Sequence, residues 1–339
     1  MTPHLVDQGP ALEVSVTAGK PVIVTVPIMH AMDIACDWLA AARPVLRALL
    51  LRHGNVYLRG LPISSSEDFA VIRDIFLASR AQYKEKATPR SSYGNDIFSS
   101  TDLPAMQAIR LHNENSYTLE FPGVLGFCCL EAPDEGGATT IADSRQVLAN
   151  VPRAIADRFR VSGWRLVRHY KKQVSLPWNV AFGTDERSRV EAYCEANKIS
   201  ARWIGEDGLA TTQRRPAIIR HPATGEESWF NHVAFWNSWA LDDDVREVLV
   251  DTYGADGLPF ETFLGDGQLL TQDDVRQLMD AYDAATCREQ WRKGDVMFVD
   301  NILCAHGRDA FRGSRRVLVA MGEPVAMTDC SPFPQPSAT

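Results

Sequence analysis

The sequence predicts a mainly β protein in which helices flank a β core. Apolar runs rich in β-branched residues, each about the length of a single strand, occur near both ends of the chain and in its middle. Helical patterns cluster in the first quarter of the chain and in one stretch of its second half. A regular alternation of strand and helix is not evident, which argues against a doubly wound parallel sheet.

Composition and charge narrow the class of protein. The chain has 339 residues, of which 45% are apolar and 23% charged, values typical of a globular protein of one enlarged β domain or two domains. A net charge of −8 without a basic run argues against nucleic acid and anionic membranes as partners. Without an 18-residue apolar window or signal-peptide pattern, and with seven cysteines but no C-x-x-C pair, we expect a cytoplasmic protein with reduced thiols.

The first 106 residues predict three strands, two helices and a long loop. In order, these are strands 12–18 and 21–28, helix 31–52, strand 55–62, helix 64–83 and loop 84–106. Pro44 interrupts the first helical pattern. The second helix has a clear start, because Ser65 and Asp68 have the spacing of a capping box.

The remainder predicts further strands separated by two helices. In order, these are strands 121–133 and 163–170, helices 187–198 and 270–287, and strands 291–308 and 315–321. A glycine turn at residues 136–137 separates the first strand from the segment TTIADSRQVL. Thr271, with Asp274 three residues later, caps the second helix.

Two short motifs carry candidate metal ligands. His112 and Glu114 lie two residues apart in LHNENSY, and on a strand such residues point to the same face and converge on one ion. His306 follows a strand of buried character in DNILCAHGRDAF. Each motif alone is also typical of a structural polar residue. Together, two imidazoles and one carboxylate leave three positions of an octahedron open, as ferrous oxygenases require, although an open zinc site uses the same donors.

A third group of residues favours an anionic ligand beside the metal. Thr139 and Thr140 follow the glycine turn in GGATT, and Arg315 and Arg316 come nine and ten residues after His306. A metal cation repels an arginine unless an anion lies between them, and the guanidinium fork fits a carboxylate through two hydrogen bonds. Two arginines at a strand end are also typical of a solvated surface.

Four segments, taken in order, resemble the taurine dioxygenase/clavaminate synthase-like superfamily of non-haem iron, 2-oxoglutarate-dependent oxygenases. They are LHNENSY, EGGATTIADSRQVL, RRPAIIRHPATGEESWFNH and WRKGDVMFVDNILCAHGRDAFRGSRRVLVAM. The resemblance spans residues 50–325 approximately and is strongest with the syringomycin-biosynthesis hydroxylase-like branch. Members of that branch often modify amino acids in peptide natural-product pathways.

The resemblance implies a metal site and a reaction. His112, Glu114 and His306 match the Fe(II) ligands of the superfamily. Many relatives have Asp where this chain has Glu114, whereas iron-dependent halogenases lack that carboxylate, so halogenation is not expected. The implied reaction uses O2 and converts 2-oxoglutarate to succinate and CO2, while an unactivated C–H bond of the substrate is oxidised.

The resemblance also implies how 2-oxoglutarate is held. Thr139 matches the residue that hydrogen-bonds its distal carboxylate, and the carboxylate-binding arginine falls on Arg315 or Arg316. Adjacent residues of a strand face opposite ways, so only one of the two fits. We favour Arg315, the first arginine after the glycine turn.

The fold implied by the resemblance is a double-stranded β-helix (jelly-roll, cupin-like) core with helices packed outside. We expect a single oxygenase domain over residues 1–339, with the metal ligands on neighbouring strands 107–113 and 295–305. Its expected parts are N-terminal strands and a helix (1–50), the core with the metal site (51–149 and 291–325), an insertion with remaining core strands (150–290) and a tail (326–339).

Candidate substrate contacts lie next to these motifs. Asn115 and Tyr117 follow the first motif, and Asn231 lies in the aromatic segment 229–239, which is also typical of core packing. Arg110 and Arg308 flank the histidines, where each could bind a substrate carboxylate or form a structural salt bridge.

The leading hypothesis is hydroxylation of an amino acid or amino-acid-derived metabolite, free or presented by a carrier protein, in natural-product biosynthesis. The same site could instead perform desaturation, epoxidation or oxidative cyclisation, which the sequence does not distinguish. A non-catalytic jelly-roll protein that binds a metal or ligand is the alternative of a different class, although a structural zinc normally has four protein ligands and only three are found.

Overall fold

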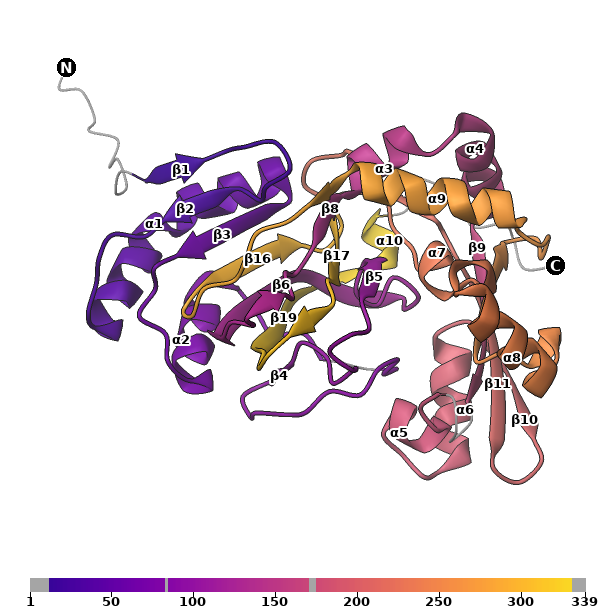
Figure 1. The fold of residues 1–339 in the computed structure, drawn as a ribbon. Coiled ribbons are helices and arrows are strands. Elements are labelled where there is room, and N and C mark those ends of the chain that lie inside the picture. Colours follow the sequence, from indigo (N-terminus) through magenta and orange to yellow (C-terminus); the bar gives the residue numbers. More distant parts are fainter. Residues whose placement is uncertain (1–11, 83–84, 171–174, 331–339) are drawn as a thin grey trace, which may run out of the picture.

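The computed structural model describes residues 12–82, 85–170 and 175–330, in which two β-sheets face each other with helices outside them (Figure 1). The larger sheet has the order β1 (Glu13–Ser15), β2 (Ile23–Thr25), β3 (Asn55–Arg59), β16 (Val296–Asp300), β6 (Glu120–Glu131), β19 (Arg316–Ala326), β4 (Ile97–Ser99). The smaller has the order β15 (Thr286–Cys287), β8 (Ile141–Asp143), β17 (Cys304–Arg308), β5 (Ile109–His112).

The space between these two sheets is filled by apolar side chains from both. Phe127, Met297 and Val317 of the larger sheet pack in one buried cluster with Ile141 and Cys304 of the smaller sheet. Successive residues of a strand point to opposite faces, and on the other face of the larger sheet Phe298 and Leu318 pack in a second buried apolar cluster. That face is covered by helices, and the prediction of a β core flanked by helices is confirmed.

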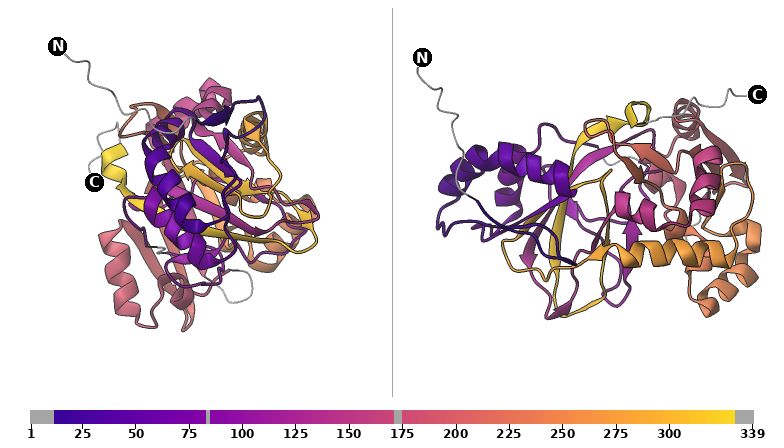
Figure 2. Two further views of the ribbon diagram at one scale, coloured as in Figure 1. Left: turned by 90° about the vertical axis from the view of Figure 1, so that its left-hand side faces the viewer. Right: turned by 90° about the horizontal axis from the view of Figure 1, so that it is seen from above.

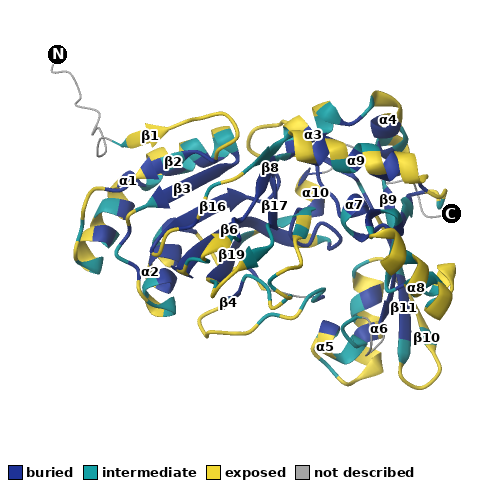
Figure 3. Ribbon diagram, in the orientation of Figure 1, coloured by how far each residue is buried: buried dark blue, intermediate teal, exposed yellow. Residues whose placement is uncertain are grey.

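Helices α1 (Met32–His53) and α2 (Ser66–Phe76) cover the outer face of the larger sheet. The buried residues of α1 recur every three or four positions, whereas its outward side is exposed (Figure 3). Pro44 lies inside α1 without ending it. The capping box of α2 is formed, because the Ser65 side chain accepts from the Asp68 N–H and the Asp68 side chain accepts from the Ser65 N–H.

The segment between Asn150 and Thr286 forms a further sheet and several helices at the end of the molecule away from α1 and α2 (Figure 2). Its sheet has the order β10 (Ile199–Ile204), β11 (Gly208–Arg215), β9 (Trp164–Tyr170), β14 (Phe260–Leu264). A hairpin pairs β12 (Ile218–Arg220) with β13 (Glu227–Trp229). The surrounding helices are α3 (Ser144–Asn150), α4 (Arg153–Ser162), α5 (Trp178–Phe182), α6 (Arg187–Ala196), α7 (Val233–Trp236), η1 (Ser238–Ala240), α8 (Asp243–Tyr253), η2 (Ala255–Gly257) and α9 (Gln272–Ala284).

Two predictions for the N-terminal third are wrong in part. The helix expected over 64–83 ends at Phe76, because residues 77–81 run beside β19 instead, with the Ala81 N–H donating to the Met321 carbonyl. The expected loop 84–106 contains β4, which pairs with the same strand. In both places an unpaired strand edge of β19 supplies hydrogen bonds that local sequence does not reveal.

The strand expected over 295–305 is two strands in different sheets. β16 ends at Asp300 and β17 begins at Cys304, so the chain crosses from the larger to the smaller sheet between them. The Asp300 side chain makes this turn, because its carboxylate accepts from the N–H groups of Ile302 and Leu303. The expected proximity of the two histidine strands is confirmed, since His306 of β17 lies opposite His112 of β5.

The remaining elements lie at the ends of the sheets and of the described chain. A short ladder pairs β7 (Glu135–Gly136) with β18 (Phe311–Arg312) beside the glycine turn. Part of the expected tail, residues 327–330, forms α10 (Met327–Cys330), and residues 331–339 lie outside the described residues. All seven cysteines are free thiols. Within the described ranges, no helix combines the length and apolar character needed to cross a membrane.

Candidate active site

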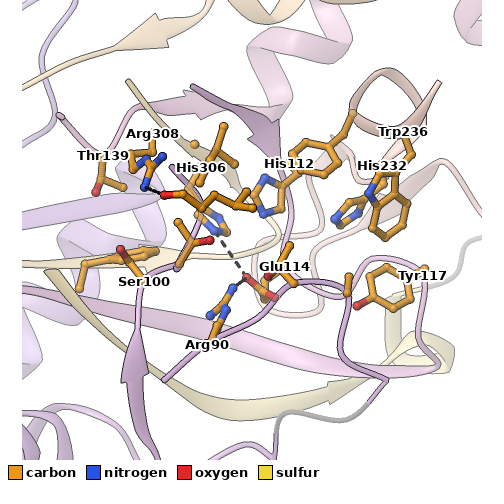
Figure 4. A pocket seen from close by; sticks show the side chains of 18 of the residues that line it. Arg90, Ser100, His112, Glu114, Tyr117, Thr139, His232, Trp236, His306 and Arg308 are labelled. Atoms are coloured by element: carbon orange, nitrogen blue, oxygen red, sulfur yellow. Dashed lines mark hydrogen bonds and ion pairs between the residues drawn. The ribbon is translucent and has the colours of Figure 1, made fainter. Parts of the chain in front are cut away.

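Two histidines and a glutamate meet where β5 and β17 run side by side. His112 and His306 are paired across these strands with ring centroids 4.5 Å apart. Nitrogen or oxygen atoms of His112, Glu114 and His306 lie within 4.8 Å of one another (Figure 4). The structure therefore brings together all three residues that the two motifs single out.

Glu114 does not lie on the strand, contrary to the reasoning from i and i+2 positions. β5 ends at His112, and Glu114 is in the turn that follows. Asn301 holds this turn, because its side chain accepts from the Glu114 N–H at 2.7 Å and donates to the Glu114 carbonyl at 2.9 Å. The same amide donates to the Pro122 carbonyl at 2.8 Å, which ties the turn to β6. Sequence reasoning missed Asn301, whose function depends on contacts 187 residues away.

The protonation states of His112 and Glu114 suit a divalent metal. Burial, reinforced by the charge of His306, lowers the pKa of His112 to about 3, so its ring is neutral near pH 7. Burial alone would raise the pKa of Glu114. The charge of Arg90, together with the contact between Glu114 and His306, instead holds that pKa well below its usual range. His112 Nδ1 lies 2.9 Å from the Arg110 carbonyl, a contact that orients the ring and leaves Nε2 for a ligand. Neutral imidazoles and an ionised carboxylate are the donors of an open ferrous site.

Arg90 is a functional residue that sequence reasoning missed. It comes from the segment expected as a loop, and its Nη2 lies 2.7 Å from Glu114 Oε2. Both side chains are only 6% exposed, so this is a buried ion pair. His306 Nε2 lies 3.6 Å from the same carboxylate oxygen. An arginine within a Ser- and Pro-rich segment has no local pattern that indicates such a contact.

A second polar corner of the cavity is built around Arg315. Its guanidinium donates to the Gly137 carbonyl at 2.8 Å, to Ser100 Oγ at 3.1 Å and to Thr139 Oγ1 at 3.2 Å. Trp291 Nε1 also donates to Thr139 Oγ1, at 3.1 Å. Burial and the neighbouring charge of Arg308 lower the pKa of Arg315 to about 10, so the guanidinium remains charged near pH 7.

The choice between the two arginines follows from burial. Arg315 lines the same cavity as the triad, whereas Arg316 is exposed at the first position of β19. Arg315 lies just before β19 rather than on it, so the choice follows from burial and not from the alternation of strand residues. Gly137 has φ +66°, and a Cβ there would come within 2.9 Å of Phe311 and 3.1 Å of the Arg315 side chain, so the glycine turn is what admits Arg315.

The expected substrate residues fall in different places. Tyr117 lines the cavity and donates to the Glu85 carbonyl at 2.9 Å, while Asn115 is buried beside it at φ +54°. Arg308 lines the cavity too, but its guanidinium donates to the carbonyls of residues 103, 104 and 107 and so holds that loop. The expectation for Asn231 is not met, because it lies outside the cavity lining and its amide bonds to the backbone of Ala217 and Val233.

The cavity has an aromatic wall on the side away from Thr139 (Figure 4). His232 stacks on Trp236 with ring centroids 4.2 Å apart. The Nδ1 atom of His232 also shares a hydrogen bond of 2.6 Å with Ser116 Oγ. Phe235 completes the wall and contacts His112, with ring centroids 4.6 Å apart. Apolar cavities with a few converging polar groups are typical of small-molecule sites.

Comparison with known proteins gives consistent results. The family model described as "Taurine catabolism dioxygenase TauD, TfdA family" matches residues 31–321. The dapdiamide synthesis protein DdaC of Enterobacter agglomerans is 34% identical over 293 residues, which cover 86% of this chain and 89% of that protein. A clavaminate synthase-like protein of Arabidopsis thaliana is 28% identical over 288 residues, covering 81% and 83%.

Solved structures share the fold at low identity. PvcB from Pseudomonas aeruginosa superposes with a TM-score of 0.52 at 16% identity, covering 95% of this chain and 94% of that one. A second PvcB structure, described as an Fe, alpha-ketoglutarate dependent oxygenase from an isonitrile synthetic pathway, has a TM-score of 0.51 at 17% identity with the same coverage.

Proposed function

Because this chain belongs to the taurine catabolism dioxygenase TauD, TfdA family and is an Fe(II)/2-oxoglutarate-dependent oxygenase, we propose that it hydroxylates an unactivated C–H bond of an amino-acid-derived metabolite. The enzyme requires Fe(II), 2-oxoglutarate and O2, as this class does. We propose that its two facing sheets are the double-stranded β-helix and that the chain acts as a single oxygenase domain.

The metal ligands of this proposal are His112, Glu114 and His306. The observation that carries it is their meeting within 4.8 Å in the cavity that Arg315 also lines. Three protein donors would leave positions of a bound ion open for other ligands, which a closed structural zinc site would not do. Bound there, Fe(II) supplies the redox chemistry that couples decarboxylation of 2-oxoglutarate to oxidation of a C–H bond.

Arg315 and Thr139 are proposed to hold the distal carboxylate of 2-oxoglutarate. Within the described residues, the Arg315 guanidinium donates to neutral acceptors, so an anion would gain a charge-assisted hydrogen bond without displacing a carboxylate of that part of the chain. This arrangement aims the keto acid end of the molecule toward the triad, across the same cavity. The residues thus fix the direction in which 2-oxoglutarate enters.

Other residues orient the ligands and limit access to the site. Asn301 holds the backbone of Glu114, and the Arg110 carbonyl fixes the ring of His112. The aromatic wall of Phe235 and Trp236 shields the triad from solvent on the side where a substrate would approach. Enclosure of this kind protects a strong oxidant from side reactions.

The substrate class is proposed from relatedness and from the cavity. The relative from Enterobacter agglomerans acts in dapdiamide synthesis by its name, which supports a role in natural-product biosynthesis for this chain as well. The substrate could be free or carrier-bound, and the same site could yield a desaturated, epoxidised or cyclised product. Product mass separates these outcomes, since hydroxylation or epoxidation adds about 16 Da and desaturation or cyclisation removes about 2 Da.

The proposal is tested by anaerobic titration of metal-free protein with Fe(II) and 2-oxoglutarate. We expect the weak visible charge-transfer absorption of their chelate in the wild-type protein and not in His112→Ala. Arg315→Gln should require more 2-oxoglutarate to reach the same absorbance. A folded, iron-loaded wild-type protein that shows no such band would contradict the assigned residues.

A further inference from the structure

A second cavity adjoins the one that contains the triad. Six residues line both cavities: Ala87, Thr88, Leu103, Ile109, Phe235 and Trp236. We call this second cavity the vestibule. Because the two cavities have these side chains in common, a molecule in the vestibule lies next to the cavity that contains His112 and Glu114.

The vestibule is largely apolar and has one charged group. Leucine, aromatic, proline and alanine side chains make up most of its lining. Among the described residues that line it, Arg110 alone is charged. Apolar walls with a single charged anchor are typical of a site that fixes the direction of a small molecule.

The position of Arg110 relates it directly to the triad. It lies on β5 two residues before His112, so both side chains leave the strand on the same side and their Cα atoms are about 7 Å apart. Its backbone carbonyl already contacts the His112 ring. A group bound by the Arg110 guanidinium would therefore lie at the outer end of a molecule whose other end reaches the triad.

The Arg110 guanidinium is available for a ligand. The carboxylates of Asp242 and Asp283 interact electrostatically with the guanidinium of Arg110. Within the described residues, neither forms an ion pair with it. Within the described residues, it donates no hydrogen bond to another protein group. The structural salt bridge that the sequence left open as an alternative for this residue is thus absent from the described part of the chain.

We propose that the vestibule holds the body of the substrate and that Arg110 binds a carboxylate at its outer end. This inference rests on the proposed function and narrows its substrate class to amino-acid derivatives with an apolar middle and a free carboxylate remote from the oxidised carbon. A substrate held in this way is not tethered to a carrier protein through that carboxylate.

The test uses two fluorescent probes that differ only in charge at one end. N-dansylglycine has an aromatic body and a free carboxylate, and its amide, dansylglycinamide, is neutral. Binding to the metal-free full-length protein is followed by dansyl fluorescence for wild type, Arg110→Gln and Arg110→Lys. Arg153→Gln, which removes an exposed arginine on α4, is the matched control for loss of one charge.

We expect Arg110→Gln to weaken dansylglycine binding by about 3- to 10-fold, the range for a partly exposed charge-assisted hydrogen bond. Arg110→Lys should fall between the two, and dansylglycinamide should bind all variants equally. Equal dansylglycine affinity in wild type and Arg110→Gln would overturn the proposal. So would an equal loss for both probes, which indicates a packing effect, or the absence of saturable binding to wild type.

A parallel titration separates this inference from the proposed function. The affinity of Mn(II)-loaded protein for 2-oxoglutarate should be the same in wild type and Arg110→Gln, because Arg315 lies at the other polar corner. Failure of wild type to bind 2-oxoglutarate would contradict the proposed function while leaving the probe result intact. Weaker 2-oxoglutarate binding in Arg110→Gln would instead place Arg110 at the cosubstrate and overturn its assignment to the substrate.

Discussion

The two polar corners of the cavity treat charge in opposite ways. At the triad, the carboxylate of Glu114 is already offset by the guanidinium of Arg90 at 2.7 Å. At the other corner, the Arg315 guanidinium donates to a carbonyl and two hydroxyls, and no carboxylate of the described residues forms an ion pair with it. At the first corner, the charge of the carboxylate is balanced without a ligand. At the second corner, a bound anion would balance the charge of the guanidinium.

This difference in charge indicates which kind of ligand, a cation or an anion, binds at each corner. A cation that binds at Glu114 must share that carboxylate with Arg90, and it is repelled by the same guanidinium. Arg90 therefore restricts how the carboxylate is presented, because the oxygen that it contacts is also the one that lies 3.6 Å from His306 Nε2. At Arg315 an anion meets no such competition. The comparison predicts that substitutions in the two corners differ in their effect on the ligand-free protein.

The largest expected effect comes from Glu114→Ala. This change removes one of three metal ligands and the carboxylate that the buried Arg90 contacts, so we expect loss of metal binding and of 2-oxoglutarate turnover. The free energy of unfolding of the metal-free protein should fall by roughly 3–5 kcal/mol, the cost of breaking a buried ion pair from one side. Equilibrium dialysis with Fe(II) and urea denaturation measure the two effects. Glu131→Ala, at an exposed position of β6, should change neither.

Arg315→Gln should have the next largest effect, and on the ligand rather than on stability. Loss of a charge-assisted contact should weaken 2-oxoglutarate binding by roughly 10- to 100-fold. Because no carboxylate is left unpaired, the unfolding free energy of the ligand-free protein should change by no more than about 1 kcal/mol. Isothermal titration against Mn(II)-loaded protein provides the affinity. The matched variant Arg316→Gln, one residue away and exposed, should bind 2-oxoglutarate as wild type does.

The motif residues of both corners were predictable, because each lies in a short local pattern. The spacing of His112 and Glu114, and the glycine turn before Thr139, are visible within a few residues of sequence. The sequence narrowed the carboxylate-binding residue to Arg315 or Arg316, and burial in the structure favours Arg315. The β core and the capped helices followed from periodicity in the same way.

The residues that complete each corner were not predictable, because they depend on contacts between distant segments. Arg90 lies 24 residues from Glu114, and Trp291 lies 152 residues from Thr139. The end of α2 and the presence of β4 likewise follow from the free edge of β19 rather than from local propensity. The position of Asn231 outside the cavity lining was unpredictable for the same reason, since its amide forms hydrogen bonds with the backbone of Ala217 and Val233.

Arg90→Met should have a smaller effect than either of the preceding changes. The variant retains a side chain of similar length but no longer holds one oxygen of Glu114, so we expect about a 10-fold loss of Fe(II) affinity, the lower end for a residue that orients a metal ligand. Arg90→Lys, which keeps the charge, should recover part of this loss. Competition between Fe(II) and a chromophoric chelator measures the affinity. Tighter metal binding in Arg90→Met would mean that repulsion of the cation outweighs positioning of the carboxylate.

Trp291→Phe should have the smallest effect, and it tests the orientation of a single hydroxyl, that of Thr139, at the Arg315 corner. Thr139 Oγ1 already accepts from Trp291 Nε1 and from Arg315, so its two lone pairs are used and its own O–H is left to donate. That orientation suits an anion, and it is lost in part when the indole N–H is removed. We expect a 2- to 5-fold loss of 2-oxoglutarate affinity, as for one neutral hydrogen bond, with Fe(II) affinity unchanged. Trp203→Phe, whose indole bonds Glu191 far from the cavity, is the control. An equal loss in both variants would mean that the Thr139 hydroxyl is not oriented by Trp291.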